Sequence, residues 1–423
     1  MKLRLIIALA SILMLFSGAV VSAQDDVVLN VLAMDQAGMT PEDLAEIAAR
    51  FEEANPGVQV ELQFVLYDGL YDTIVTSVSS NPPAFDIILV DDIWYAAFAD
   101  AGWVLDISER ITPEMRAGIF EAAWDITTVN DVVYGLPYLL DQKYFFYNTE
   151  ILAAAGFDAP PRTWEELADM ARVIKANGVE YPMIWSWAQV EAVVPDFVTL
   201  LYGNGGRFLD ENNQPAFNDA AGVATLQWMV DMINEGLVNP ASITSAEEDV
   251  RNVFSAGNAA FATNWLYMYN LAQDPAESQV AGNVAMSLMP VFASALDAGT
   301  ESSTNNGSMG FAVTAGSLSQ DAAWGFLSFL TSEEIQIEFS ALQLPTWATA
   351  FANPALVEAN PVTVPMFAEQ FPYSNVRPKV PYYPEASRIL QLAIQEALTG
   401  AKTPQQALDD AAAQIIEVAQ DYE

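Results

Sequence analysis

The alternation of short apolar segments with amphipathic helical segments most constrains the fold of this 423-residue chain. Residues 58–64 alternate apolar and polar side chains with a period of two, which predicts a strand with one wetter face. Just before them, Leu44, Ile47 and Phe51 recur at helical spacing, which predicts a helix with one buried stripe. Repetition of this pattern is typical of an α/β protein with mainly parallel sheets, and the length favours two domains.

Signals for helix N-termini recur along the chain. At Thr40-Pro41 a capping threonine precedes a proline at the first helical position. Elsewhere a Ser or Thr is followed three residues later by Glu or Gln, the pattern of a capping box. These pairs are Thr163 with Glu166, Ser245 with Glu248, Thr331 with Glu334, and Thr403 with Gln406. We therefore expect a helix to begin at each of these positions.

The first 23 residues read as a signal peptide. Lys2 and Arg4 precede an apolar run over residues 5–16, and Val21-Ser22-Ala23 supplies the small residues of a cleavage site. The apolar run is shorter than the roughly 20 residues that span a bilayer, although an uncleaved N-terminal anchor is the alternative. The chain has no Cys for lipid attachment, so we expect a freely diffusing periplasmic or secreted protein.

The charge balance is strongly acidic, with 15 Lys and Arg against 55 Asp and Glu and a net charge of −40. Such a surface repels nucleic acid and anionic lipid, so we expect neither as a partner. A solvated acidic coat accounts for the charge, and attraction of a cationic solute such as a polyamine is the alternative. After signal removal, no segment offers about 18 consecutive apolar residues, so we expect no membrane insertion.

The sequence lacks the usual residues of several kinds of active site. It contains neither His nor Cys, which removes the commonest general base, the commonest zinc ligands and every thiol nucleophile. No phosphate-binding loop or dinucleotide fingerprint is present. We therefore expect no cofactor and no metal, and a binding protein rather than an enzyme.

Aromatic and acidic residues follow several apolar strands. One strand runs into Asp91 and Trp94, a second into Trp187, and a third into Trp265, with Tyr269 four residues further on. In open α/β sheets, ligands bind outside the carboxyl ends of the strands. An indole packs against the C–H face of a sugar ring, and carboxylates accept bonds from its hydroxyls. These residues are candidate sugar contacts, whereas core packing is the assignment for four other tryptophans: Trp103, Trp164, Trp228 and Trp324.

Cations are rare, which draws attention to Arg377 and Lys379 in the Pro-rich stretch 376–384. A guanidinium among aromatic residues can fork onto neighbouring hydroxyls or pair with a buried carboxylate. A surface ion pair is the alternative interpretation.

Several segments resemble the extracellular solute-binding proteins of ABC importers, in particular those that handle oligosaccharides. The resemblance covers nearly the whole chain after the signal peptide. It rests on an ordered set of segments: Phe51–Val58, Tyr134–Pro137 with Tyr147–Thr149, Ala159–Leu167, and Phe254–Phe261 with Asn264-Trp265.

The resemblance implies a two-lobed periplasmic-binding-protein fold of type II, with discontinuous lobes and a ligand cleft between them. The N-terminal lobe would comprise residues 24–139 and 287–331, and the C-terminal lobe residues 140–286 and 332–423. The chain would then cross between the lobes near residues 139–142, 283–287 and 330–334.

Within that family the sequence is most similar to trehalose/maltose-binding proteins, and the resemblance implies a set of sugar contacts. They are Asp91, Trp94, Asp141, Trp265 and Arg377. The sequence departs from that pattern at Met309, where those proteins carry a second stacking Trp, and at Leu139, which replaces an expected Tyr. Tyr67 and Tyr71 occupy a region where an Arg is expected. We expect Asp91, Trp94 and Met309 to face Trp187, Trp265 and Arg377 across the cleft, with Asp141 at a crossover.

The resemblance implies the substrate-binding component of an ABC importer, a monomer that captures a di- or oligosaccharide and delivers it to the membrane permease. Two alternatives stay open: a binder of a polyol or polyamine in the same fold, and a glycoside hydrolase that uses Asp91 and Asp141 as its carboxyl pair.

Overall fold

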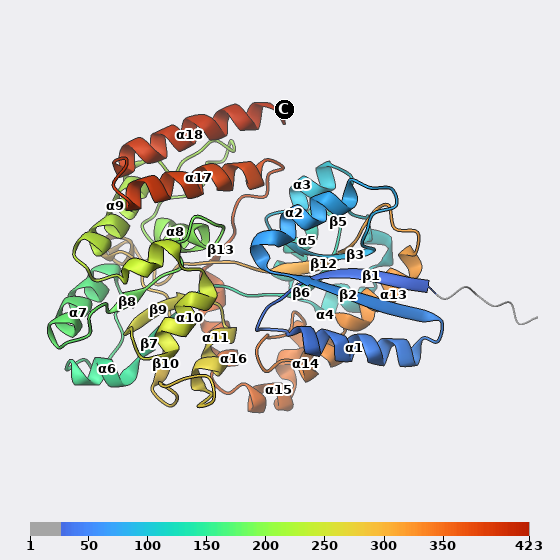
Figure 1. Ribbon diagram of the computed structural model, residues 1–423, viewed down its shortest axis with the longest axis horizontal. Coiled ribbons are helices and arrows are strands. Elements are labelled where there is room, and N and C mark those ends of the chain that lie inside the picture. The colour runs from blue at the N-terminus through green and yellow to red at the C-terminus, as the bar shows by residue number, and fades with distance from the viewer. Residues whose placement is uncertain (1–26, 423) are drawn as a thin grey trace, which may run out of the picture.

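The computed structural model describes residues 27–422, so the predicted signal peptide at 1–23 lies outside the described residues. Two lobes are visible in Figure 1, each built around its own sheet. The N-terminal lobe holds a five-stranded sheet in the order β2 (Val58–Val65), β1 (Val27–Met34), β3 (Ile87–Asp91), β12 (Met309–Val313), β6 (Leu136–Leu139). The C-terminal lobe holds a four-stranded sheet in the order β10 (Val284–Ser287), β7 (Tyr144–Asn148), β9 (Phe261–Asn264), β8 (Met183–Ile184).

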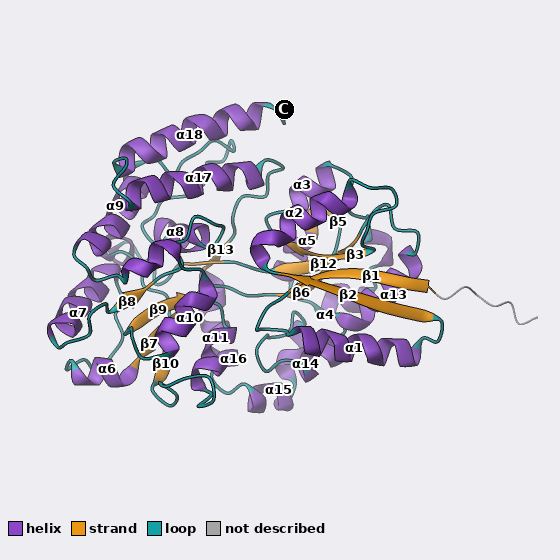
Figure 2. Cartoon of the chain, in the orientation of Figure 1, coloured by secondary structure: helices purple, strands orange, loops and turns teal. Residues whose placement is uncertain are grey.

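Helices pack around both sheets, as Figure 2 shows, which confirms the predicted α/β class. The N-terminal lobe carries α1 (Pro41–Ala54), α2 (Tyr67–Val78), α3 (Tyr95–Asp100), α4 (Pro113–Gly118), α5 (Glu121–Thr127), α13 (Gln320–Leu330) and α14 (Glu333–Glu338). The C-terminal lobe carries α6 (Thr149–Ala154), α7 (Trp164–Ala176), α8 (Val193–Tyr202), α9 (Ala220–Asn234), α10 (Glu247–Ser255), α11 (Tyr267–Gln273), α12 (Ala293–Asp297), α17 (Tyr383–Leu398) and α18 (Pro404–Gln420). Two further helices, α15 (Pro354–Ala359) and α16 (Thr363–Gln370), follow α14. Within residues 27–422, no helix has the length and apolar character needed to cross a membrane.

Both sheets are mixed, which corrects the expectation of mainly parallel strands. β1 pairs in parallel with β2 and β3, and β8 with β9. In contrast, β12 is antiparallel to β3 and β6, and β7 is antiparallel to β9 and β10. β7 and β12 are the strands that enter a lobe from the other one. Each starts at the interlobe edge, where its neighbours end, and therefore runs against them.

The chain changes lobes later than expected at two of three places. It passes from β6 to β7 through residues 140–143. Residues 288–303 then stay with the C-terminal lobe, where Phe292 N–H donates to Gly203 O at 2.9 Å, so the second change lies at 304–308 instead of 283–287. Residues after 331 still contact β6, because Gln343 Nε2 donates to Tyr138 O at 2.9 Å. The chain returns through β13 (Ser374–Asn375), which pairs with β11 (Thr304–Asn305) between the lobes.

The helix-start signals succeed where the capping pair has no competing partner. The boxes of Thr40 with Asp43 and of Thr403 with Gln406 are complete, and Thr163 caps α7. Two other expected starts are wrong by one or two residues. α10 begins at Glu247 with Ala246 as its N-cap, so Ser245 lies outside the helix. The hydroxyl of Thr331 donates to Leu327 O of the preceding helix, and α14 begins at Glu333.

Candidate ligand-binding site

A cavity of about 640 Å³ lies between the lobes. Of the residues proposed from the sequence, five line it: Asp91, Asp141, Trp265, Met309 and Arg377. The structure leaves the other three, Trp94, Trp187 and Tyr269, away from its wall. The cavity thus has wall residues from the five-stranded sheet, from helices and loops of the C-terminal lobe, and from the segments that join the lobes.

The N-terminal wall forms where strands of the five-stranded sheet meet the interlobe edge. β3 ends at Asp91, which lies opposite Met309, the first residue of β12. Met309 also lies opposite Leu139, the last residue of β6. Because β12 starts where β3 and β6 end, these three side chains share one edge and line the cavity together. Met309 offers this wall a flexible apolar surface.

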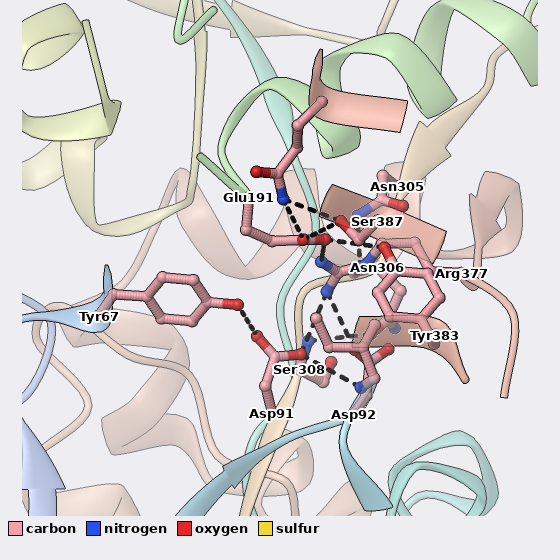
Figure 3. A network of polar contacts seen from close by, with 12 residues as sticks. Tyr67, Asp91, Asp92, Glu191, Asn305, Asn306, Ser308, Arg377, Tyr383 and Ser387 are labelled. Atoms are coloured by element: carbon pink, nitrogen blue, oxygen red, sulfur yellow. Dashed lines mark hydrogen bonds and ion pairs between the residues drawn. The ribbon is translucent and has the colours of Figure 1, made fainter. Parts of the chain in front are cut away.

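Arg377 is the centre of an ionic network that joins the lobes, shown in Figure 3. One amino group of its guanidinium lies 3.2 Å from Asp91 Oδ1 and 2.9 Å from Asp92 Oδ1, both on the N-terminal lobe. Its other amino group lies 2.8 Å from Oε1 of Glu191, on the C-terminal lobe. Only 2% of the Arg377 side chain is exposed, which excludes the surface ion pair considered above.

Hydroxyl and amide groups complete the network. Tyr67 donates to Asp91 Oδ2 at 2.7 Å, and Tyr383 donates to Glu191 Oε1 at 2.8 Å. Ser387 also donates to Glu191. Burial raises the pKa of the Glu191 carboxyl, and Arg377 counteracts that rise by stabilising the charged form. The carboxylates around Arg377 are therefore paired and hydrogen-bonded, as buried charges must be.

Asp141 lies in the first crossover and lines the cavity. Its carboxylate accepts backbone hydrogen bonds from Gln142 N at 2.8 Å and from Leu266 N at 3.3 Å. Burial nevertheless raises the pKa of Asp141 to about 7, because desolvation outweighs these bonds and the nearby charge of Lys143. The group therefore titrates near neutral pH.

We expect this titration to appear in the stability of the protein. The folded state holds the Asp141 proton up to about pH 7, whereas the unfolded chain releases it near the ordinary value of 3.8. Stability is therefore lost as pH rises through the folded pKa, by about 1 kcal/mol from about pH 6 to about pH 8. Chemical unfolding across this pH range should show that the free energy of unfolding of Asp141→Asn lacks this decrease. Asp321→Asn is the control, because the Asp321 side chain is 93% exposed. An equal dependence of the unfolding free energy on pH in both variants would contradict the assignment.

Trp265 is the only tryptophan among the described residues that lines the cavity. It follows β9 directly and is half-buried. Its indole Nε1–H donates to Glu247 Oε1 at 3.3 Å. A Cβ placed on Gly307 would lie 2.2 Å from Cη2 of the ring, so the indole packs directly against the backbone there. One part of the ring is thus fixed by the protein while another borders the cavity.

Trp94 lies one layer behind the wall, which corrects the expectation that it faces the ligand. It is 5% exposed and stacks on Tyr67 at 5.6 Å between ring centroids, with Tyr71 edge-on at 5.4 Å. Trp94 follows the strand end as expected, but α2 places Tyr67 in front of it. Trp94 therefore supports the tyrosine that holds Asp91.

Trp187 and Tyr269 also lie outside the cavity. Trp187 has no exposed surface, stacks on Trp185 at 5.2 Å, and accepts a hydrogen bond on its backbone oxygen from Gln395 of α17. α17 comes from a distant part of the sequence and contacts the backbone at Trp187. Tyr269 lies on α11, where its hydroxyl accepts from Gln273 Nε2 at 3.1 Å. Both side chains belong to the packing of the C-terminal lobe.

Sequence reasoning missed other residues in or beneath the wall: Tyr67, Asp68, Glu191 and Glu247 line the cavity, and Lys143 lies beneath Trp265. Lys143 carried a signal, because it is one of few cations and precedes the apolar run Tyr144-Phe145-Phe146. Nothing in the sequence distinguishes the acidic residues of the cavity, because they are a few among 55 acidic side chains.

Residues 37–337 match the family model described as bacterial extracellular solute-binding protein. A probable ABC transporter-binding protein of Deinococcus radiodurans is 27% identical over 335 residues, which cover 76% of this chain and 77% of that protein.

Among solved structures, maltose-bound MalE3 of T. maritima superposes with a TM-score of 0.85 at 27% identity, covering 93% of this chain and 100% of the other. A solute-binding protein of Thermotoga lettingae with bound alpha-D-tagatose gives a TM-score of 0.83 at 26% identity, covering 93% and 99%. The two lobes and the interlobe cavity are consistent with the family match, which covers more than half of the sequence. This chain belongs to the family of bacterial extracellular solute-binding proteins.

Proposed function

We propose that this protein is the substrate-binding component of an ABC importer, which captures a carbohydrate in the interlobe cavity and delivers it to the membrane permease. The observation that carries the proposal is the half-buried Trp265 beside carboxylates of both lobes in one cavity. An indole face packs against the C–H face of a pyranose. Carboxylates in the lining accept hydrogen bonds from sugar hydroxyls, the stronger kind because one partner is charged.

The size of the cavity supports a di- or oligosaccharide. Its volume of about 640 Å³ falls within the range of roughly 300–1,000 Å³ typical of pockets for drug-sized ligands. The maltose-bound and tagatose-bound proteins described above are structural neighbours at 27% and 26% identity. Maltose, a disaccharide, is accordingly the first probe.

A cationic solute is the second candidate, because of the acidic lining. Asp68 of α2 and Glu247 of α10 line the cavity from opposite lobes. Burial raises the pKa of Asp68, and the charge of Glu247 adds to that rise. A positively charged group between them would relieve the repulsion. Arg377 favours the neutral sugar, because it already supplies a cation to this wall.

Binding without catalysis is part of the proposal. The two carboxylates that a hydrolase would use are already occupied: Asp91 by Tyr67 and Arg377, and Asp141 by two backbone N–H groups. We further propose that the signal peptide is cleaved after Ala23, and that the released protein acts as a periplasmic or secreted monomer.

A thermal-shift screen over mono-, di- and oligosaccharides, polyols and polyamines tests the proposal. A ligand at about 100 times its Kd adds roughly 2.7 kcal/mol to the folded state, which should raise the Tm by a few degrees. We expect maltose or another di- or oligosaccharide to give the largest shift, and chromatography to recover it unchanged. A shift with spermidine and none with sugars would favour the second candidate. Hydrolysis of the sugar would overturn the proposal that the protein only binds.

A further inference from the structure

Lys143 is a fully buried cation that lies beneath the aromatic ring lining the cavity. Its side chain has no exposed surface, and it does not line the cavity itself. The ammonium Nζ lies 4.9 Å from the centroid of the Trp265 ring, within the distance at which a cation is attracted to an indole face. This attraction is stronger where water is excluded, as it is here.

The same ammonium organises the groups around the indole. Nζ donates to Ser186 Oγ at 3.0 Å and lies 3.4 Å from Asp196 Oδ1. It also lies 3.5 Å from Oε1 of Glu247, the atom that accepts the Trp265 Nε1–H. One carboxylate oxygen is therefore shared by the lysine and the indole. Lys143 contacts the face of the ring, and Glu247, which pairs with Lys143, accepts the hydrogen bond of the ring nitrogen.

Trp265 also touches both of the chain segments that join the lobes on its side. Lys143 ends the crossover at 140–143, and Gly307, against the ring, lies in the crossover at 304–308. The two segments bond to each other, with Gly307 N donating to Asp141 O at 3.0 Å and Lys143 N donating to Asn305 O at 3.0 Å. The ring therefore contacts both segments through which the chain passes between the lobes.

We propose that Lys143 is a positioning residue that sets the plane of Trp265 toward the ligand and ties the ring to the crossover segments. It acts through the indole rather than by touching the ligand. Its contribution therefore exists only when an indole is present at position 265. A lysine that merely stabilises the lobe would contribute equally with or without Trp265.

A charge-matched pair of substitutions tests this role. Lys143→Met alone would leave the buried carboxylate of Asp196 without its cation, so it is combined with Asp196→Asn, and the pair removes one charge of each sign. Asn keeps a carbonyl oxygen for Ser186, whose N–H and hydroxyl both donate to Asp196 Oδ2. The matched control is Lys175→Met, because Lys175 lies 5.6 Å from the ring centroid of Tyr181 and does not line the cavity.

The first readout needs no ligand and does not depend on the proposed function. We expect Lys143→Met with Asp196→Asn to change the near-ultraviolet circular dichroism and tryptophan emission, and to cause no such change in a Trp265→Phe background. The control should change neither. An identical spectral change in both backgrounds, or none in either, would overturn the proposal.

The second readout rests on the proposed function and uses maltose as the probe. With Trp265 present, the pair of substitutions is expected to weaken maltose binding by about 3-fold to 30-fold, the range of a desolvated cation–ring contact. In a Trp265→Ala background the same pair should have no further effect. Equal losses in both backgrounds would make Lys143 merely structural. A wild type without any maltose response counts against maltose as the ligand, and the spectral readout then decides the role of Lys143.

Discussion

Replacing Arg377 with methionine is expected to separate the lobes and to cost about 3–5 kcal/mol of stability in the joined form. The guanidinium is the shared partner of Asp91 and Asp92 on one lobe and Glu191 on the other. Its removal leaves these carboxylates buried without a cation, which costs more than the pair itself contributes. Small-angle scattering should show a larger radius of gyration for the unliganded variant than for the unliganded wild type.

Arg388→Met is the matched control for Arg377. Arg388 also pairs across the lobes, 3.6 Å from Asp72, but both side chains are exposed, at 56% and 80%. An exposed pair contributes at most about 1 kcal/mol, so this variant should keep the wild-type radius of gyration. Circular dichroism should show both variants folded. An unchanged radius for Arg377→Met would mean that the network does not hold the lobes together.

Truncation of Trp265 to alanine is expected to weaken carbohydrate binding by about 30-fold to 1,000-fold, the range of aromatic hot spots. The reason is its position: it supplies the only indole among the described cavity residues, because Met309 offers no second ring. Isothermal titration with the sugar found in the screen measures the loss.

Substitutions of two other tryptophans serve as comparisons for that loss of affinity. Trp324→Ala is the matched control, since Trp324 is also half-buried with a cation, Arg110, 5.8 Å from its ring centroid, and it does not line the cavity. Its affinity should equal that of the wild type. Trp94→Ala removes a buried ring from a stack, so it should lower stability more than affinity. Equal affinity losses at 94 and 265, at equal stability, would show that the ligand contacts a different part of the wall.

Local patterns in the sequence were sufficient for the elements of the fold. The strand at Val58–Val65 and the buried stripe of α1 follow from the spacing of apolar residues alone, because burial on one face repeats with the geometry of the element. Asp91 could likewise be placed in the site, since it ends a buried strand and the ends of strands form the binding edge.

The identity of the exposed aromatic ring could not be derived in the same way. Trp94, Trp187 and Trp265 each follow an apolar strand, yet only Trp265 borders the cavity. Tyr67 covers Trp94, and Trp187 is buried beneath elements that include α17, hundreds of residues away in sequence. Exposure of a side chain depends on which distant segments pack over it. The residues near it in sequence do not specify which segments those are.

The sequence by itself thus determined individual elements, such as the strand at Val58–Val65 and the buried stripe of α1, and the strand end at which Asp91 borders the cavity. Only the tertiary structure decided where the chain changes lobes, which ring borders the cavity, and that Arg377 meets Asp91, Asp92 and Glu191. The physical reason is range: periodicity and capping act over a few residues, whereas the network brings together charges about 190 to 290 positions apart, which only packing of the two lobes can do.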